Sequence, residues 1–164
     1  MQPVGARAYF RCAHCGTFGF PTTIGDGIAV LDRDGNLPCP VCRATLGIGT
    51  ISGIAVQFCD ECRGFLTTNA EFGAIVQNRR NDPGSGSGIA PVFDRVELQR
   101  RLRCPACEKS METHPYGGGG NAVVDTCHRC HLIWLDAGEL DVIGRYRPAV
   151  GVRFAATVSS SSDS

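Results

Sequence analysis

Short hydrophobic runs separated by glycine and polar residues fill most of the chain. The runs Ile54-Ala55-Val56 and Ala122-Val123-Val124 are β-prone and predict strands. Two later stretches have hydrophobic residues at helical spacing and predict short helices: Phe72, Ile75 and Val76 in one, Leu140 and Ile143 in the other. The pattern therefore predicts a small α+β fold in which strands precede each helix.

The start of each predicted helix carries the same pair of polar residues. Thr68 and Asp136 are N-cap residues, and a glutamate follows each of them three positions later, Glu71 or Glu139. At this spacing the two side chains can satisfy free amides of the first helical turn. Pro148 ends the second helix.

The composition leaves little material for a hydrophobic core. The chain has 164 residues, of which 43% are hydrophobic and 20% charged, and it contains 21 glycines but one tryptophan. A glycine-rich chain with few large side chains buries too little surface to fold on hydrophobic packing alone. Another source of stability is therefore expected.

Cysteine pairs supply that source. All ten cysteines fall into Cys-x-x-Cys pairs: Cys12/Cys15, Cys39/Cys42, Cys59/Cys62, Cys104/Cys107 and Cys127/Cys130. Regular pairs are typical of metal sites, whereas a disulfide framework has varied spacings and normally follows a secretory signal. Residues 1–7 lead into no hydrophobic signal segment, and no run approaches the roughly 20 hydrophobic residues of a membrane span. We therefore expect a cytoplasmic protein without membrane contact.

The pairs belong to an internal repeat. Cys39/Cys42 and Cys104/Cys107 are offset by 65 residues, and Cys59/Cys62 and Cys127/Cys130 are offset by 68. The second copy thus has three extra residues, which we assign to the glycine run 117–120, because insertion in a loop costs little stability. The repeat predicts two tandem units of the same fold.

The spacing between pairs assigns the ligands of two zinc ions. Sixteen residues separate Cys42 from Cys59 and nineteen separate Cys107 from Cys127, both within the range of roughly 15 to 20 found in zinc sites. Cys15 and Cys39 are separated by 23 residues, outside that range. We predict two four-cysteine zinc sites per chain, with iron as the chemical alternative. Their ligands are Cys39, Cys42, Cys59 and Cys62 in one site, and Cys104, Cys107, Cys127 and Cys130 in the other.

The pair Cys12/Cys15 has no matching pair at zinc spacing. It can complete a third zinc site with a second copy of itself or with a His or Asp, or replace one of the assigned pairs. It can also cycle as a redox dithiol or stay reduced. The sequence favours none of these roles, and we expect the surrounding segment to pack on the first zinc unit.

These assignments divide the chain into five segments. A hairpin segment, with a strand over 27–31 and a turn signal at Asp34-Gly35, precedes the first unit. A run rich in glycine and serine links the two units. The segments are 1–38 (N-terminal hairpin), 39–80 (first unit), 81–93 (flexible linker), 94–150 (second unit) and 151–164 (serine-rich tail).

The second unit resembles a known family. The segment from Cys104 to Leu140 contains both cysteine pairs and the run Trp134-Leu135-Asp136-Ala137-Gly138-Glu139-Leu140, and it is similar to the transcription-factor-IIB-type zinc-finger family. The first unit keeps the cysteines and Glu71 but has Phe65-Leu66-Thr67-Thr68 in place of the Trp-Leu-Asp run, so it is a degenerate copy. The resemblance implies a zinc ribbon fold with metal binding, and the family name implies transcription. The expected fold is two tandem zinc ribbons, each a β-hairpin with a four-cysteine zinc site followed by a short helix.

Other residues near the predicted sites are assigned structural roles. Trp134 is expected to belong to a small core beside the second zinc. His128 and His131 flank Cys130 but are not needed as ligands beside four cysteines. One basic cluster is interleaved with acidic residues and is expected to be a solvent-exposed face; it comprises Arg95, Arg100, Arg101 and Arg103.

Ligand number and charge together indicate a binding module. Four protein ligands leave no position for water, so we expect structural zinc and no enzymatic activity. The formal net charge is zero, and a zinc ion with four thiolates adds about −2 per site. A negative protein favours a protein partner over nucleic acid. Nucleic-acid binding in transcription, and a redox or metal-handling role of Cys12/Cys15, are the alternatives.

Overall fold

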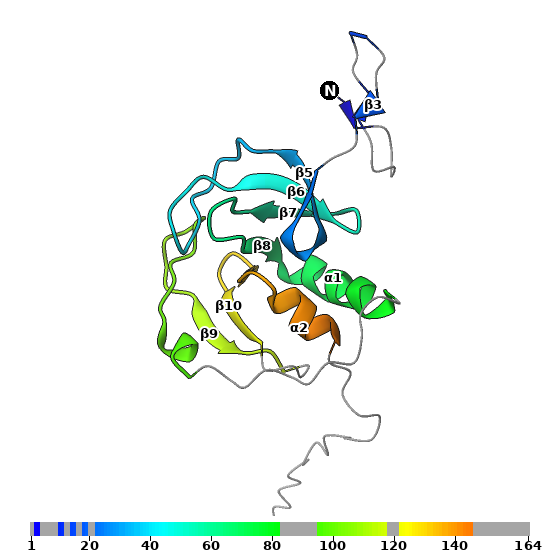
Figure 1. The fold of residues 1–164 in the computed structure, drawn as a ribbon. Coiled ribbons are helices and arrows are strands. Elements are labelled where there is room, and N and C mark those ends of the chain that lie inside the picture. The colour runs from blue at the N-terminus through cyan, green and yellow to red at the C-terminus, as the bar shows by residue number, and fades with distance from the viewer. Residues whose placement is uncertain are drawn as a thin grey trace, which may run out of the picture.

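The computed structural model describes residues 22–82, 95–117 and 122–145, together with the short segments 2–3, 10–11, 14–15 and 18–19 (Figure 1). Three short N-terminal strands form an antiparallel sheet of their own: β1 (Gln2–Pro3), β2 (Phe10–Arg11) and β3 (Phe18–Gly19). None of the described helices has the length and hydrophobicity needed to cross a bilayer.

The main sheet has eight antiparallel strands in the order β4-β5-β6-β7-β8-β11-β10-β9. Five come from the first half of the chain: β4 (Thr23–Ile24), β5 (Ile28–Asp32), β6 (Gly47–Ile51), β7 (Ile54–Phe58) and β8 (Phe65–Thr68). Three come from the second half: β9 (Glu112–Pro115), β10 (Val123–Cys127) and β11 (Leu132–Leu135). Both β-prone runs of the sequence lie in strands, β7 and β10.

The predicted N-terminal strand forms, but its hairpin differs from the expected one. Strand β5 pairs with β4 through the 3-10 turn η1 (Gly25–Gly27) and with β6 on its other side. Asp34-Gly35 lies instead in the connection from β5 to Cys39, where the Gly35 N–H donates to the Leu46 carbonyl at 3.0 Å. Asp34-Gly35 is therefore part of a longer connection and not the turn of a hairpin.

Helix α1 (Asn69–Asn81) begins where the sequence predicts a cap, whereas helix α2 (Glu139–Arg145) begins three residues after its predicted N-cap, Asp136. Helix α1 follows β8 directly, and its N-cap Thr68 accepts a hydrogen bond from the Glu71 N–H at 3.2 Å. Helix α2 follows β11, and Glu139 accepts from the Asp136 N–H at 2.7 Å. A short 3-10 helix, η2 (Glu97–Gln99), precedes the second cysteine group.

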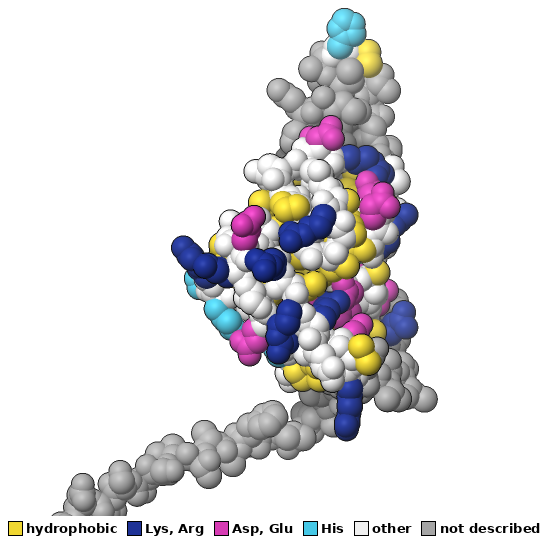
Figure 2. All heavy atoms as spheres, turned by 90° about the vertical axis from the view of Figure 1, so that its left-hand side faces the viewer, with side chains coloured by type: hydrophobic (Ala, Val, Ile, Leu, Met, Phe, Trp, Pro, Cys, Tyr) yellow, Lys and Arg dark blue, Asp and Glu magenta, His cyan; other side chains and the backbone are white. Residues whose placement is uncertain are grey.

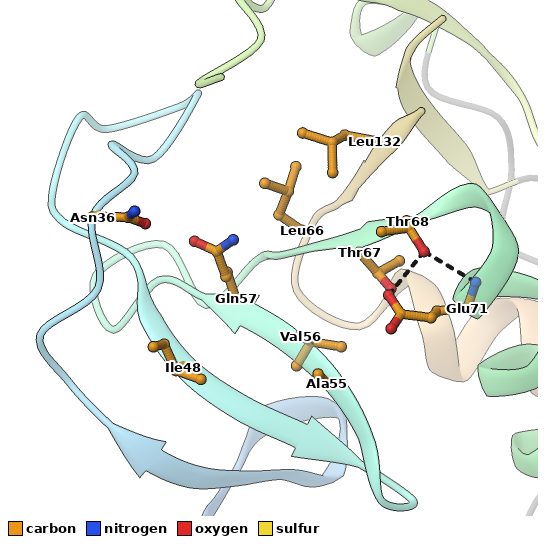
Figure 3. Close-up of a pocket in the computed structure, with 10 residues that line it drawn as sticks. All are labelled: Asn36, Ile48, Ala55, Val56, Gln57, Leu66, Thr67, Thr68, Glu71 and Leu132. Atoms are coloured by element: carbon orange, nitrogen blue, oxygen red, sulfur yellow. Dashed lines mark hydrogen bonds between the residues drawn. The ribbon is translucent and has the colours of Figure 1, made fainter. Parts of the chain in front are cut away.

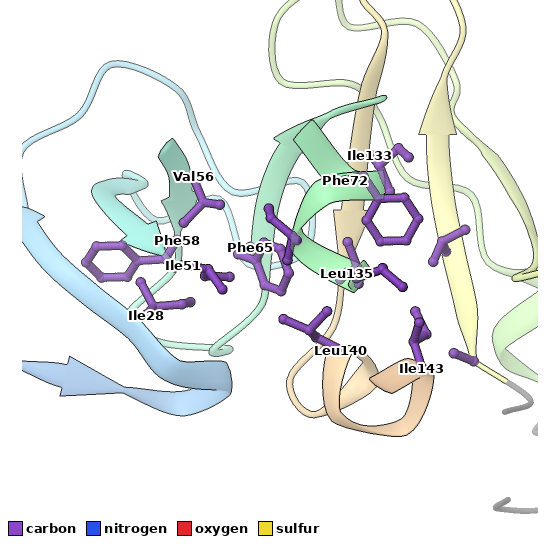
Figure 4. Close-up of a cluster of buried hydrophobic side chains, with 14 residues drawn as sticks. Ile28, Ile51, Val56, Phe58, Phe65, Phe72, Ile133, Leu135, Leu140 and Ile143 are labelled. Atoms are coloured by element: carbon purple, nitrogen blue, oxygen red, sulfur yellow. The ribbon is translucent and has the colours of Figure 1, made fainter. Parts of the chain in front are cut away.

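Both helices pack on the same face of the sheet (Figures 1 and 4). The ion pair between Arg79 of α1 and Asp141 of α2, at 3.4 Å, joins them. The buried side chains between helices and sheet form what we call the helix-side core: Ile28, Ile51, Val56, Phe58, Phe65, Phe72, Ile75, Val76, Ala122, Val124, Ile133, Leu135, Leu140 and Ile143.

A second buried cluster, the metal-side core, contains four of the predicted ligands. It comprises Cys39, Leu46, Cys59, Leu66, Cys104, Met111, Cys127 and Trp134. Strand alternation explains the division, because successive side chains of a strand point to opposite faces. On β11, Ile133 and Leu135 belong to the helix-side core, and Trp134 lies between them in sequence but on the metal side.

Strands β8 and β11 join the two halves of the chain, and we call this pairing the central seam. Leu132 pairs with Thr68, Ile133 with Thr67, Trp134 with Leu66 and Leu135 with Phe65. The sheet is therefore continuous from one half to the other, a junction that the sequence pattern does not predict.

Candidate metal centres

The structure brings eight cysteines together in two groups of four. One group is Cys39, Cys42, Cys59 and Cys62, and the other is Cys104, Cys107, Cys127 and Cys130. Within each group all sulfur atoms lie within 4.8 Å of one another. These are the two groups that the spacing of the pairs predicted.

The backbone of the cysteine turns explains why the sulfur atoms converge. The amide of Arg43 donates to the Cys39 carbonyl at 3.1 Å, and the amide of Arg63 donates in the same way to Cys59 at 3.1 Å. In all four turns the residue after the second cysteine has a positive φ: Arg43 (68°), Arg63 (66°), Glu108 (59°) and His131 (55°). The repeated left-handed residue closes each turn tightly enough to direct both side chains at one point.

The sulfur separations fit a metal ion better than a disulfide. The Sγ atoms of Cys39 and Cys62 are 3.5 Å apart, those of Cys42 and Cys59 are 3.4 Å apart, and those of Cys107 and Cys127 are 3.7 Å apart. A tetrahedron with Zn–S bonds of about 2.3 Å has edges of about 3.8 Å, whereas a disulfide is about 2.05 Å long. The eight cysteines of the two groups form no disulfide, so the donor sets suit tetrahedral zinc.

Comparison with known proteins agrees with this geometry. Residues 103–145 match the model of the transcription factor zinc-finger family. This segment is a zinc ribbon of the transcription-factor-IIB type. No curated protein and no solved structure matches the chain. The match covers the second cysteine group, and the first group at 39–62 is consistent with a tandem copy. The predictions of a zinc ribbon and of two four-cysteine zinc sites per chain are therefore confirmed.

The thiols within each site differ in pKa: backbone amides lower the pKa of Cys42 and lower that of Cys107 to about 7, whereas other ligands have raised values. Burial raises the pKa of the Cys39 thiol, and it raises the pKa of Cys62 to about 11. A hydrogen bond with Cys107 raises the pKa of Cys130 to about 12. Zinc requires thiolates, so its binding releases the protons that these thiols hold. Amides offset part of the cost, because the Val41 and Cys42 N–H groups donate to the Cys39 sulfur at 3.4 and 3.5 Å.

Trp134 lies in the metal-side core together with cysteines of both groups. This agrees with the prediction that it belongs to a small core beside the second zinc. It is 0% exposed, and its indole N–H donates to Asp136 at 2.9 Å. Its ring fits because Gly64 faces it: a Cβ on Gly64 would overlap the indole. Trp134 therefore packs against the first half of the chain as well as its own ribbon.

The expectation of a solvent-exposed basic face is wrong for Arg100. Its Nε donates to Asp125 at 3.1 Å, and its other nitrogens bond Asp125 and Asp136. The Asp125 side chain is 0% exposed. These partners lie 25 and 36 positions away in the sequence, so local charge alternation did not indicate them. An aspartate inside the hydrophobic run before Cys127 was the signal that could have done so. Arg95, Arg101 and Arg103 are exposed.

The two histidines near the second site lie outside it. His128 Nε2 is 2.7 Å from the carboxylate of Glu112, and both side chains are largely exposed. Neither His128 nor His131 belongs to a cysteine group. Of the unassigned pair, Cys15 is exposed, and Cys12 lies outside the residues whose side chains are described. The alternatives for this pair therefore remain predictions.

Proposed function

We propose that the protein is a non-catalytic interaction module built from two tandem zinc ribbons, each followed by a helix. The observation that carries this proposal is the ligand set: each site offers four cysteine sulfurs within 4.8 Å of one another. Four protein ligands leave zinc no open position for water or substrate, so the metal stabilises the fold and takes no part in chemistry.

The surface around the cysteine turns suits contact with another protein. Figure 2 shows a band of hydrophobic surface on this side of the molecule, with acidic and basic side chains around it. Val41 and Ile48 are 44% and 39% exposed. A hydrophobic centre with a charged rim is the common pattern of protein interfaces, and the negative charge of the zinc-loaded chain disfavours nucleic acid.

The second candidate function is nucleic-acid binding, which would fit a role in transcription. Exposed arginines in and near the cysteine turns support it: Arg43, Arg63, Arg101, Arg103 and Arg129. Asp60, Glu61 and Glu108 lie in the same turns and reduce the local positive charge. Both candidates use the same face, so they are separated by the response to salt.

The test uses the zinc-loaded full chain. Bound material is captured from cell extract with and without nuclease, identified, and then titrated as a purified component at about 50 and 200 mM salt. We expect that a protein is captured with or without nuclease, and that its affinity for the chain depends weakly on salt concentration. Nucleic acid held through roughly 6–10 phosphates would lose about 10³–10⁵ in affinity over that range. Capture that nuclease abolishes, with this steep loss, would overturn the proposal of a protein partner.

A further inference from the structure

A hollow of about 270 Å³ opens beside strands β6, β7 and β8 (Figure 3). Strands β7 and β8 pair only at Gln57–Leu66 and Phe58–Phe65, so they part next to it. Five hydrophobic residues line it, Ile48, Ala55, Val56, Leu66 and Leu132, together with five polar ones, Asn36, Gln57, Thr67, Thr68 and Glu71. Ligand pockets usually measure about 300–1,000 Å³, so the hollow suits one side chain.

Two oxygen atoms on this wall are buried without a hydrogen-bond partner. They are Oε1 of Gln57 and Oγ1 of Thr67, and Thr67 as a whole is 3% exposed. The side chain of Gln57 projects from β7 towards Asn36 and Leu66 (Figure 3). Buried polar atoms in folded proteins nearly always have a partner. These two acceptors therefore point to a ligand that donates hydrogen bonds.

The second half of the chain shows what lies in the corresponding place. There the Arg100 side chain bonds Asp125 and Asp136, and its carbonyl accepts from Thr113 Oγ1 at 3.1 Å. The repeat offsets of 65 and 68 relate Ile48 to Thr113, Gln57 to Asp125 and Thr68 to Asp136. All three first-half counterparts line the hollow.

The backbone supports this correspondence. The Leu46 amide donates to Leu37 at 2.8 Å, and the Met111 amide donates to Leu102 at 2.9 Å, which are the same bond at an offset of 65. The pair Gln57–Leu66 likewise matches Asp125–Trp134 at an offset of 68. By the first offset Arg100 corresponds to Gly35, where an added Cβ would overlap the Leu46 carbonyl oxygen, so this position cannot supply a side chain of its own. Three of the residues that line the hollow therefore correspond to the residues that contact Arg100 in the second ribbon.

We propose that this hollow binds an arginine side chain presented by a partner protein. The site deepens the proposed function, on which it rests. The hydrophobic wall accommodates the aliphatic stem of arginine, and the planar guanidinium supplies several donors to Gln57 and to the carboxylate of Glu71. Gln57 and Thr68 replace the two aspartates that hold Arg100, so the site keeps one carboxylate and binds reversibly.

The direct test titrates N-acetyl-arginine amide into the zinc-loaded full chain and follows ¹⁵N-amide NMR shifts. We expect saturable shifts at Gln57, Leu66 and Thr68, with N-acetyl-lysine amide and N-acetyl-tryptophan amide binding more weakly. No saturable shift at these positions, or tighter binding of the tryptophan amide, would overturn the proposal.

Variants make the test specific to arginine. Gln57→Asp with Thr68→Asp restores the acidic pair of the second half, and Asp remains a good N-cap. This double variant should lower the Kd for N-acetyl-arginine amide at least about tenfold, because charge-assisted hydrogen bonds are roughly twice as strong as neutral ones. The Kd for N-acetyl-tryptophan amide should stay the same. Ala55→Trp, at an exposed position on the wall, should abolish binding. Two zinc ions per chain and unchanged second-half amide shifts confirm that each variant is folded.

The same variants separate this site from the proposed function. If Ala55→Trp abolishes arginine-amide binding and weakens the captured protein partner, both proposals are supported. If the partner binds Ala55→Trp as tightly as the unchanged chain, the arginine site is wrong while the interaction module stands. If no protein partner is captured from extract, the proposed function fails, whatever the arginine amide does.

Discussion

Leu66 and Trp134 pair directly across the central seam, and they occupy corresponding positions of the two halves. The adjacent pairs follow the same relation. Phe65 pairs with Leu135, and Thr67 pairs with Ile133. At the offset of 68, Phe65 corresponds to Ile133 and Thr67 to Leu135, so the two pairs are equivalent. A local two-fold axis therefore passes through the Leu66–Trp134 pair. The two halves of the sheet, each with its cysteine group, meet as the subunits of a symmetric dimer do.

Trp134 is the largest fully buried side chain of this junction. We expect Trp134→Ala to lower the free energy of unfolding by about 3–5 kcal/mol, because large-to-small core substitutions lose burial and leave a cavity. Urea denaturation followed by circular dichroism measures the change. Val96→Ala, at a position 74% exposed, is the control and should stay within about 0.5 kcal/mol. Similar values for both variants would contradict the central role of Trp134.

Zinc removal should unfold both ribbons in one transition. The metal-side core includes cysteines from both sites together with Leu66 and Trp134, so neither site can lose its metal without exposing shared surface. Native mass spectrometry during chelator titration should find chains that hold two zinc ions or none, with little of a one-zinc species. Two well-separated unfolding transitions during chelator titration would show that the ribbons are independent.

Arg100 neutralises a buried carboxylate. Arg100→Leu should lower the free energy of unfolding by about 3 kcal/mol, because it removes the cation beside the buried Asp125 and leaves the Thr113 hydroxyl as its side-chain partner. The low end of the usual range applies, since the Arg100 side chain is 23% exposed. The neighbouring Arg101→Leu, at an exposed position, tests whether loss of any arginine has this effect. Equal destabilisation by the two would rule out the ion pair as the cause.

Two glycines should respond to alanine with opposite signs. A Cβ on Gly64 would overlap the Trp134 ring and lie 2.7 Å from the Leu135 carbonyl oxygen, so Gly64→Ala must displace packed atoms. Gly73 lies in α1, where an added Cβ would have no neighbouring atom within 4 Å. Gly73→Ala should therefore raise the free energy of unfolding by about 0.5–1 kcal/mol. Thermal denaturation of both variants checks the signs.

Burial raises the pKa of Glu139 from 4.5 to about 8, despite hydrogen bonds from the Asp136 and Val123 amides. Between these values the folded chain holds a proton that the unfolded chain has lost. The contribution of this group to the free energy of unfolding therefore falls as pH rises from about 4.5 to 8. Carboxyl ¹³C NMR titration, with Glu139→Gln to assign the resonance, measures the midpoint. A midpoint at the ordinary value would disprove the effect.

The sequence predicted the cysteine groups and the start of α1 because both depend on local spacing. A Cys-x-x-Cys turn and a cap such as Thr68–Glu71 are complete within a few residues, and the repeat indicated which turns face each other. The central seam and the Arg100–Asp125 pair join residues far apart in sequence. Hydrophobic periodicity carries no information on which strands pair, so neither could be predicted from it.

The two-fold relation at the seam is made within one chain, and this has a consequence for how the protein can vary. In a dimer of identical subunits every substitution appears twice, once on each side of the axis. In this chain the two sides are encoded separately and can differ. The second half carries the Trp134 indole and the internal Arg100, whereas the first half carries Leu66 and an open hollow. Duplication within a chain allows one copy to remain a rigid support while the other acquires specificity.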